Sequence, residues 1–255
     1  MIKMSIIDDM LMEKKKLHFT LIDPENQTPS KAAEMAGVCE NLGTDAIMIG
    51  GSTVSKRDMN ETAEHIKKAI TIPLIIFPHS TDAITEYADY IFFMSLLNSI
   101  DRKYLIGEQI KGARLIDMYG IKPISVGYII VSTSKKKTTV EDVTSVTRLD
   151  KITANDHEKV IDYALAAQYL GMDCIYLEAG SGADKPIPKE MISKVKKRLN
   201  IPVIVGGGIR DGDTAMRISN AGADVIVTGT VVEKNLRAIK EIIGGIHMSQ
   251  LIPKA

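Results

Sequence analysis

Residues 201–230, IPVIVGGGIRDGDTAMRISNAGADVIVTGT, contain two short apolar runs at 203–205 and 225–227. Both runs are almost continuously hydrophobic and rich in β-branched residues, which is typical of parallel strands buried on both faces. A helical pattern lies between them, and we expect this helix to be capped by Asp213 and to end at Gly222. The stretch is therefore predicted to form a strand, a helix and a second strand.

The same pattern recurs through the rest of the chain. Further strands are expected at residues 18–22, 46–49, 74–77, 90–94, 124–130 and 174–177. Helical patterns with recognisable ends separate most of these runs. Strands that alternate with helices in this way predict an α/β protein with a (β/α)8 TIM-barrel fold, formed by residues 1–255 as a single domain. A doubly wound parallel sheet is the alternative.

Two internal similarities support the barrel. Residues 42–47 (LGTDAI) resemble residues 170–175 (LGMDCI), and both resemble residues 221–226 (AGADVI). Separately, the segments IKK and IPLI at 66–68 and 72–75 resemble VKK and IPVI at 195–197 and 201–204. Both similarities recur after about half of the chain, which favours two duplicated half-barrels. The alternative is that Gly and Asp are common wherever a helix leads into a strand.

Composition restricts the classes of protein to be considered. The 255 residues are 45% hydrophobic and 25% charged, as in ordinary globular proteins. Lys+Arg and Asp+Glu both number 32, so charge gives no reason to expect nucleic-acid binding. Cys39 and Cys174 lack metal-ligand spacing. No apolar stretch approaches the ~18 residues of a membrane span, and the acidic start does not resemble a signal peptide, so we expect a cytoplasmic protein.

Glycine motifs follow the last two predicted strands, at the barrel end where active sites lie. Gly206, Gly207 and Gly208 allow close backbone approach to an anion, and their N–H groups can converge on phosphate oxygens. The segment Thr228-Gly229-Thr230 precedes another helix, whose N-terminus favours the same anion. Together the motifs predict a phosphate site, although either one alone could form a plain turn.

The predicted strand at 174–177 leads into a third polar segment. Strand alternation places Tyr176 and Glu178 on one side, at the expected mouth of the barrel. A carboxylate there can accept a proton from a hydroxyl group. The alternatives are a structural, salt-bridged Glu178 and a Tyr176 that only packs. Gly180, Ser181 and Gly182 add further donors for a phosphate.

Asp23 and Ser52 follow the first two predicted strands and so are expected to project from neighbouring strand ends. A carboxylate with a hydroxyl group and waters suits Mg2+, but an Asp before Pro is also a common turn former. The run Lys135-Lys136-Lys137 is read as a solvated loop, with a diphosphate clamp as the alternative. Five scattered histidines are expected to be structural or exposed: His18, His65, His79, His157 and His247.

At these residues the chain resembles the geranylgeranylglyceryl phosphate synthase family, which includes a heptaprenylglyceryl phosphate synthase branch. The segments that carry the resemblance are TLIDP (20–24), GGS (50–52), YLEAGSG (176–182), GGGIR (206–210) and TGT (228–230). The YLEAGSG segment is the most discriminating, because many phosphate-binding barrels share the glycine motifs. The resemblance implies a modified TIM barrel with a reduced third helix. Only residues 78–88 separate the third and fourth predicted strands, which agrees with that expectation.

The resemblance also implies an activity: Mg2+-dependent transfer of a geranylgeranyl group from its diphosphate to the C3 hydroxyl of sn-glycerol 1-phosphate. This is the first ether bond of archaeal membrane lipids. By the same resemblance, Asp23 and Ser52 bind Mg2+. Glycerol phosphate would be bound by Tyr176, Leu177, Glu178, Ala179, Gly180, Ser181, Gly182, Gly207, Gly208, Gly229 and Thr230. The chemistry makes Glu178 the candidate base, and places Asp23, through its metal, against the charge of the departing diphosphate.

Two alternatives remain open at this stage. One is a phosphate-binding barrel isomerase or synthase of amino-acid biosynthesis, and the other is a non-catalytic phosphate-ligand sensor. We expect a homo-oligomer without a transmembrane segment that contacts membranes at most transiently. The sequence does not place the groove for the prenyl tail, set the length of that tail, or distinguish a dimer from a hexamer.

Overall fold

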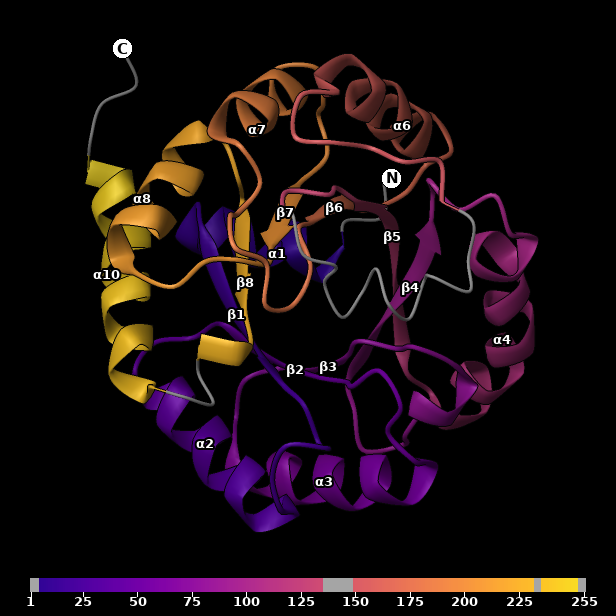
Figure 1. The fold of residues 1–255 in the computed structure, drawn as a ribbon. Helices are drawn as coiled ribbons and strands as arrows, with labels where there is room; N and C mark the ends of the chain where they lie inside the picture. The colour runs from indigo at the N-terminus through magenta and orange to yellow at the C-terminus, as the bar shows by residue number, and fades with distance from the viewer. Residues whose placement is uncertain (1–4, 135–148, 232–234, 252–255) are drawn as a thin grey trace.

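The computed structural model describes residues 5–134, 149–231 and 235–251. Parallel strands close into a barrel in the order of the chain, and helices form a ring around them (Figure 1). The strands are β1 (Leu17–Ile22), β2 (Ala46–Ile49), β3 (Leu74–Ile76), β4 (Tyr90–Leu96), β5 (Lys122–Ile130), β6 (Cys174–Glu178), β7 (Val203–Gly206) and β8 (Val225–Thr228). The predicted TIM barrel is confirmed. An open doubly wound sheet is wrong, because β8 pairs with β1.

The helices alternate with these strands. They are α1 (Ile6–Lys14), α2 (Pro29–Asn41), α3 (Lys56–Ala69), α4 (Glu108–Tyr119), α6 (His157–Tyr169), α7 (Lys189–Lys196), α8 (Gly212–Ala221) and α10 (Leu236–Leu251).

The helix α8 begins differently from the prediction. Asp211 is its N-cap and accepts a 2.7 Å hydrogen bond from the Thr214 N–H, whereas Asp213 lies in the first turn. No helix in the described part of the chain is long and apolar enough to cross a membrane.

Strand alternation separates an inner core from an outer one. Phe19, Phe92 and Tyr176 point into the barrel and belong to one hydrophobic cluster. Ile7 of α1 is fully buried in the same cluster. Figure 1 accordingly shows α1 behind the strands, near the centre of the barrel. With one end filled in this way, the open end is the one at which the strands finish.

The helix after β3 is reduced to one turn. Only η1 (Thr81–Ala83), a 3-10 helix, lies between β3 and β4, so the expected modification of the barrel is present. The outward side chains of β4 include Ile91 and Phe93, which pack with Ile116 of α4 in the outer core. The missing helix therefore leaves α4 as the neighbouring cover for this part of the sheet.

Each of four aspartates precedes an even-numbered strand and binds the beginning of the strand before it. In every case one carboxylate oxygen accepts a backbone N–H at 2.7–2.9 Å. The pairs are Asp45 with His18, Asp89 with Leu74, Asp173 with Ser125, and Asp224 with Val203. Three of these aspartates belong to the recurring Gly-x-Asp segments (43–45, 171–173 and 222–224), and Asp89 has the same role without the glycine, because each joins two neighbouring strands at the closed end of the barrel.

Candidate active site

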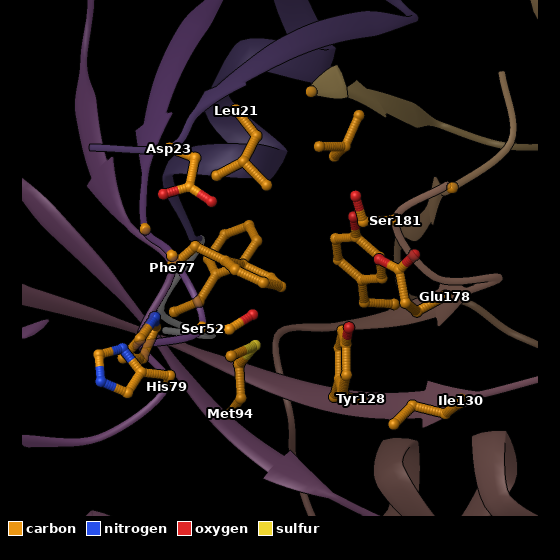
Figure 2. Close-up of a pocket in the computed structure, with 18 of the residues that line it drawn as sticks. Leu21, Asp23, Ser52, Phe77, His79, Met94, Tyr128, Ile130, Glu178 and Ser181 are labelled. Atoms are coloured by element: carbon orange, nitrogen blue, oxygen red, sulfur yellow. The ribbon is translucent and has the colours of Figure 1, made fainter. Parts of the chain in front are cut away.

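A cavity of about 850 Å³ opens at the carboxyl ends of the strands. Most of the predicted site residues line it: Asp23, Ser52, Tyr176, Glu178, Ser181, Gly182, Gly207, Gly208, Gly229 and Thr230. In Figure 2, Asp23 and His79 lie on one side of the pocket and Glu178 and Ser181 on the other, with Phe77 between them. The strand ends therefore bring together residues that are widely separated in the sequence.

Three residues of the segment 176–182 do not line this cavity. The side chains of Leu177 and Ala179 are buried in the outer core, between the barrel and its helices. Strand alternation explains this placement, because both residues face away from Tyr176 and Glu178. Gly180 instead donates its backbone N–H to Oε1 of Glu178 at 2.6 Å. Its contribution is to hold the carboxylate.

Glu178 is a buried carboxylate with several hydrogen-bond donors. Its side chain is bonded by the phenols of Tyr128 and Tyr176 as well as by Gly180. Burial raises the pKa of Glu178, and these three hydrogen bonds partly oppose that rise. Burial, together with the nearby Glu178, raises the pKa of both tyrosines well above its ordinary value. The phenols therefore stay protonated and serve as donors.

Aromatic rings form the wall of the cavity next to this carboxylate. The ring centroids of Tyr128 and Tyr176 lie 5.2 Å apart, and Phe77 lies 5.9 Å from each. Gly206 of β7 makes room for this cluster, because any Cβ there would overlap the hydroxyl of Tyr176. The sequence analysis gave Tyr128 no role. The available signal was its position two residues before the end of β5, directly opposite Tyr176 in the register.

The glycine loops meet at one end of the cavity. Gly207 and Gly208 have φ values of +85° and +71°, which favour glycine. A Cβ on Gly208 would lie 2.8 Å from the backbone between Lys185 and Pro186, so the loops after β6 and β7 touch. The loop after β8 joins them through a 3.0 Å hydrogen bond between Ser181 and Thr230. The loops after β6, β7 and β8 thus bring backbone groups and the hydroxyls of Ser181 and Thr230 together at this end of the cavity.

Arg210 adds a cationic side chain to the same end. It lines the cavity and donates from Nη2 to the carbonyl of Ala183 at 2.7 Å. A second, longer hydrogen bond of 3.4 Å joins Nη1 to the carbonyl of Asp184. The guanidinium group therefore stabilises the loop after β6 and brings a positive charge to the cavity. Arg210 was part of the glycine motif at 206–210, but no role was predicted for it.

The opposite side of the cavity is acidic. A Cβ on Gly51 would overlap Oδ1 of Asp23 and lie 2.9 Å from Oε2 of Glu25, so both carboxylates face the same space. Glu25 also accepts hydrogen bonds from the backbone and the hydroxyl of Thr53. Ser52 adds a hydroxyl group to the cavity wall. Glu25 was not among the predicted residues, because its closeness to Gly51 depends on how two loops pack.

This donor set fits Mg2+ better than zinc. Hard oxygen ligands are what Mg2+ prefers, and it is commonly bound by one or two carboxylates together with waters and substrate phosphates. Within residues 5–134, 149–231 and 235–251, no three His, Cys, Asp or Glu side chains form a metal-binding group. A cation at Asp23 and Glu25 would thus keep free positions for water and substrate oxygens.

His79 lies in the cavity wall. Its Nδ1 is buried and has no hydrogen-bond partner within the part of the chain that the structure describes. Burial lowers the pKa of His79, with opposing effects from Asp82 and Glu25. The run Lys135-Lys136-Lys137 lies outside the described residues.

An apolar arm extends the cavity beyond the barrel mouth. Its lining includes Ile91 and Phe93 on the outer face of β4, and Gly112 and Ile116 on α4. The inner lining includes Phe92 of the same strand, so the cavity reaches both faces of β4. The arm lies where the reduced third helix leaves the sheet uncovered. An elongated apolar group can therefore extend from the polar centre towards α4.

Comparisons with known proteins agree with this fold and site. The model of the PcrB family matches residues 9–246. The geranylgeranylglyceryl phosphate synthase of Thermoplasma volcanium is 44% identical over 97% of this chain and 98% of its own length. The synthase of the same name from Pyrococcus horikoshii is 46% identical over 88% of this chain and 86% of its own.

A solved structure extends the similarity to three dimensions. It is the (S)-3-O-geranylgeranylglyceryl phosphate synthase of Thermoplasma acidophilum in complex with its substrate sn-glycerol-1-phosphate. The TM-score is 0.88 at 39% sequence identity, over 96% of this chain and 100% of that one. The likeness therefore extends over nearly the whole chain.

Proposed function

The chain belongs to the PcrB family, and we propose that it joins a geranylgeranyl group to the C3 hydroxyl of sn-glycerol 1-phosphate. The donor is geranylgeranyl diphosphate, and the products are 3-O-geranylgeranylglyceryl 1-phosphate and diphosphate. The related enzyme from Thermoplasma acidophilum binds sn-glycerol-1-phosphate. The reaction is a prenyl transfer in lipid biosynthesis.

The acceptor's phosphate is assigned to the end of the cavity where the three loops meet. Gly207 and Gly208 expose backbone there, and Ser181 and Thr230 supply hydroxyl groups. Arg210 contributes the positive charge. Such convergent donors suit a phosphate dianion. Binding at this end fixes the glycerol chain, so proximity lowers the barrier before any bond changes.

Glu178 is assigned the role of general base. Its carboxylate lies beside the loop that follows β6, within reach of the glycerol when the phosphate is held there. As the C3 oxygen forms its bond to the prenyl C1, the C1–O bond to diphosphate breaks and the hydroxyl proton passes to Glu178. Tyr128 and Tyr176 hold the carboxylate in place through their hydrogen bonds.

The donor's diphosphate is assigned to the acidic side of the cavity, together with Mg2+. Asp23, Glu25 and Ser52 are the residues that would hold the cation. When bound, Mg2+ supplies positive charge against the negative charge that develops on the departing diphosphate. Asp23 and Glu25 contribute by facing one space, which gives a divalent cation two carboxylates. His79 lines the same side of the cavity as Asp23.

The prenyl tail is assigned to the apolar arm. Its walls at Ile91, Phe93 and Ile116 are hydrophobic, and burial of a hydrocarbon chain there is favourable by ~25 cal/mol per Å². The arm begins at the polar centre, so the tail can lie in the arm while the diphosphate lies on the acidic side of the cavity. This placement accounts for the reduced helix after β3, since a full helix would cover that part of β4.

The observation that carries the proposal is the position of Glu178 between the phosphate end and the aromatic wall of one cavity. The test incubates purified protein with sn-glycerol 1-phosphate, geranylgeranyl diphosphate and Mg2+, and leaves out each component in turn. We expect the ether product only when all three are present. No product with any prenyl diphosphate from C20 to C35 would contradict the proposal, and retained ligand binding would then favour a phosphate sensor.

A further inference from the structure

A buried histidine lies outside the barrel wall, directly behind the phosphate end of the site. His18 is 1% exposed and occupies the second position of β1. Its Nε2 lies 2.8 Å from the hydroxyl of Thr228, and its Nδ1 lies 2.9 Å from the hydroxyl of Thr44. Thr228 is the last residue of β8 and is itself buried. The contact therefore joins the start of β1 to the end of β8.

The neighbouring hydrogen bonds favour the tautomer in which Nδ1 of His18 carries the proton. The Thr44 hydroxyl lies 3.0 Å from the carbonyl of His18 and donates its single proton there. It must then accept from Nδ1–H of His18, and its remaining lone pair accepts from Thr20 at 3.1 Å. Nε2 consequently has a free lone pair and accepts the proton of the Thr228 hydroxyl.

The imidazole stays neutral in this position. Burial lowers the pKa of His18 to about 3, so the ring does not gain a second proton near neutral pH. With the proton on Nδ1, the Thr228 hydroxyl donates to Nε2 of His18. A neutral ring with two hydrogen-bond partners holds those partners in place, unlike a histidine that changes its charge during turnover.

The residues that follow Thr228 belong to the site. Gly229 and Thr230 line the cavity, and Thr230 is hydrogen-bonded to Ser181 of the loop after β6. A Cβ on Gly229 would lie 3.4 Å from the carbonyl of Leu21, so this loop also packs against β1. Displacement of Thr228 would move the donors that surround the phosphate.

We propose that His18 is a positioning residue, which through Thr228 sets the loop 228–230 for the phosphate of the acceptor. The inference rests on the proposed function, because it assigns that loop to glycerol phosphate. His18 touches no substrate. Its loss should weaken acceptor binding while the prenyl diphosphate, held on the opposite side of the cavity, binds as before.

Paired substitutions test this directly. Thr228→Val removes the hydroxyl and keeps the shape, whereas Thr228→Ser keeps the hydroxyl. His18→Asn places an amide near the position of Nδ1 but leaves no acceptor where Nε2 contacts Thr228. The longer side chain of His18→Gln can place its amide near the position of Nε2 and so restore that acceptor. Ser219→Ala is the matched control, because Ser219 is also buried and its hydroxyl lies 2.7 Å from that of Ser249, away from the cavity.

Two measurements are needed, namely calorimetric binding of sn-glycerol 1-phosphate and the KM values for both substrates. We expect Thr228→Val and His18→Asn to weaken binding and raise the acceptor KM about tenfold, because the donors of the displaced loop no longer align with the phosphate. The KM for geranylgeranyl diphosphate should change less than about twofold on the same scale. Thr228→Ser, His18→Gln and Ser219→Ala should bind the acceptor like the unmodified protein.

The outcomes separate the inference from the function. Undiminished acceptor binding by a folded Thr228→Val protein would overturn the positioning role while leaving the proposed function intact. An equal loss for both substrates would do the same, because it would indicate a general effect on the fold. An unmodified protein that neither binds sn-glycerol 1-phosphate nor forms the ether would overturn the proposed function, and the inference with it.

Discussion

Gly207 and Glu178 face each other so closely that a Cβ on Gly207 would lie 2.7 Å from Oε1 of Glu178. The same Cβ would lie 2.7 Å from the backbone nitrogen of Gly180, which donates to that oxygen. The glycine loop after β7 and the carboxylate at the end of β6 therefore have little room to move independently. This contact couples the phosphate site to the proposed base.

Gly207→Ala should impair both stability and acceptor binding. A residue at φ +85° costs about 1–2 kcal/mol when it carries a Cβ, and this Cβ also displaces Glu178 or Gly180. We expect a lower unfolding temperature and at least a roughly tenfold rise in the KM for sn-glycerol 1-phosphate. Thermal unfolding and steady-state kinetics measure the two effects.

Gly171→Ala is the control for that experiment. Gly171 has a similar φ of +76°, but a Cβ there would have no neighbour within 4 Å. It should therefore lose comparable stability and leave both KM values unchanged. If Gly171→Ala raised the acceptor KM as much as Gly207→Ala does, the contact with Glu178 would not be the cause.

Glu178→Gln should remove the proposed base without removing its hydrogen-bond acceptor. The single glutamine oxygen can still accept from the Gly180 N–H and from one of the phenols of Tyr128 and Tyr176. Loss of general-base catalysis typically costs 10²–10⁴-fold, so we expect kcat to fall by at least ~100-fold. Acceptor affinity should stay close to that of the unmodified protein. A variant that retained most of its turnover would exclude Glu178 as the base.

The raised pKa of Glu178 also predicts two pH effects. Turnover should increase with pH as the carboxylate loses its proton, at a pH above the ordinary glutamate value of 4.5. In the folded protein the proton is held more tightly than in the unfolded chain, so the ionised carboxylate destabilises the fold above its folded-state pKa. Glu178→Gln should thus raise the unfolding temperature at pH 8. This gain should disappear near pH 4, and a gain that instead grew in acid would contradict the assignment.

Asp23→Asn tests the metal assignment. Removing one of two carboxylates should weaken Mg2+ binding, so that higher Mg2+ is needed for half-maximal activity and maximal turnover falls by about 10–100-fold. Metal titrations of activity measure this directly. Glu34→Gln is the control, because Glu34 is exposed and paired with Lys31 on α2. An unchanged Mg2+ requirement in Asp23→Asn would show that the cation is held elsewhere.

Gly112→Leu should restrict the apolar arm. A Cβ at Gly112 already lies 2.9 Å from the side chain of Ile84, so a larger group must enter the cavity. We expect the variant to use shorter prenyl diphosphates and to lose activity with geranylgeranyl diphosphate. Gly244→Leu on α10 is the control, since a Cβ there meets nothing within 4 Å. If Gly112→Leu used long and short prenyl diphosphates equally well, the prenyl tail would not lie in the apolar arm.

The fold was predictable because its signals are local. Runs such as 203–205 and 225–227 form strands within a residue of the expected bounds, since buried parallel strands need continuous hydrophobicity. The predicted cap of α8, Asp213, was wrong, because Asp211 and Asp213 are both good caps and only the path of the loop selects between them.

The site was predictable where strand ends carry distinctive residues. Glu178 is the last residue of β6 and Gly207 directly follows β7, so the barrel rule brings them together. Glu25 and Tyr128 could not be found in this way. Their roles depend on side chains from other loops and strands, such as Gly51 and Tyr176, and those distances are not encoded in local spacing.

The most direct test of the account is the mass of the product. Purified protein is incubated with sn-glycerol 1-phosphate, Mg2+ and a mixture of prenyl diphosphates, and the extracted lipid is analysed by mass spectrometry. The account predicts the geranylgeranyl ether of glyceryl phosphate, formed by the unmodified protein and lost in Glu178→Gln. A mixture that yields no prenyl ether, or an ether formed equally well without Glu178, would contradict it.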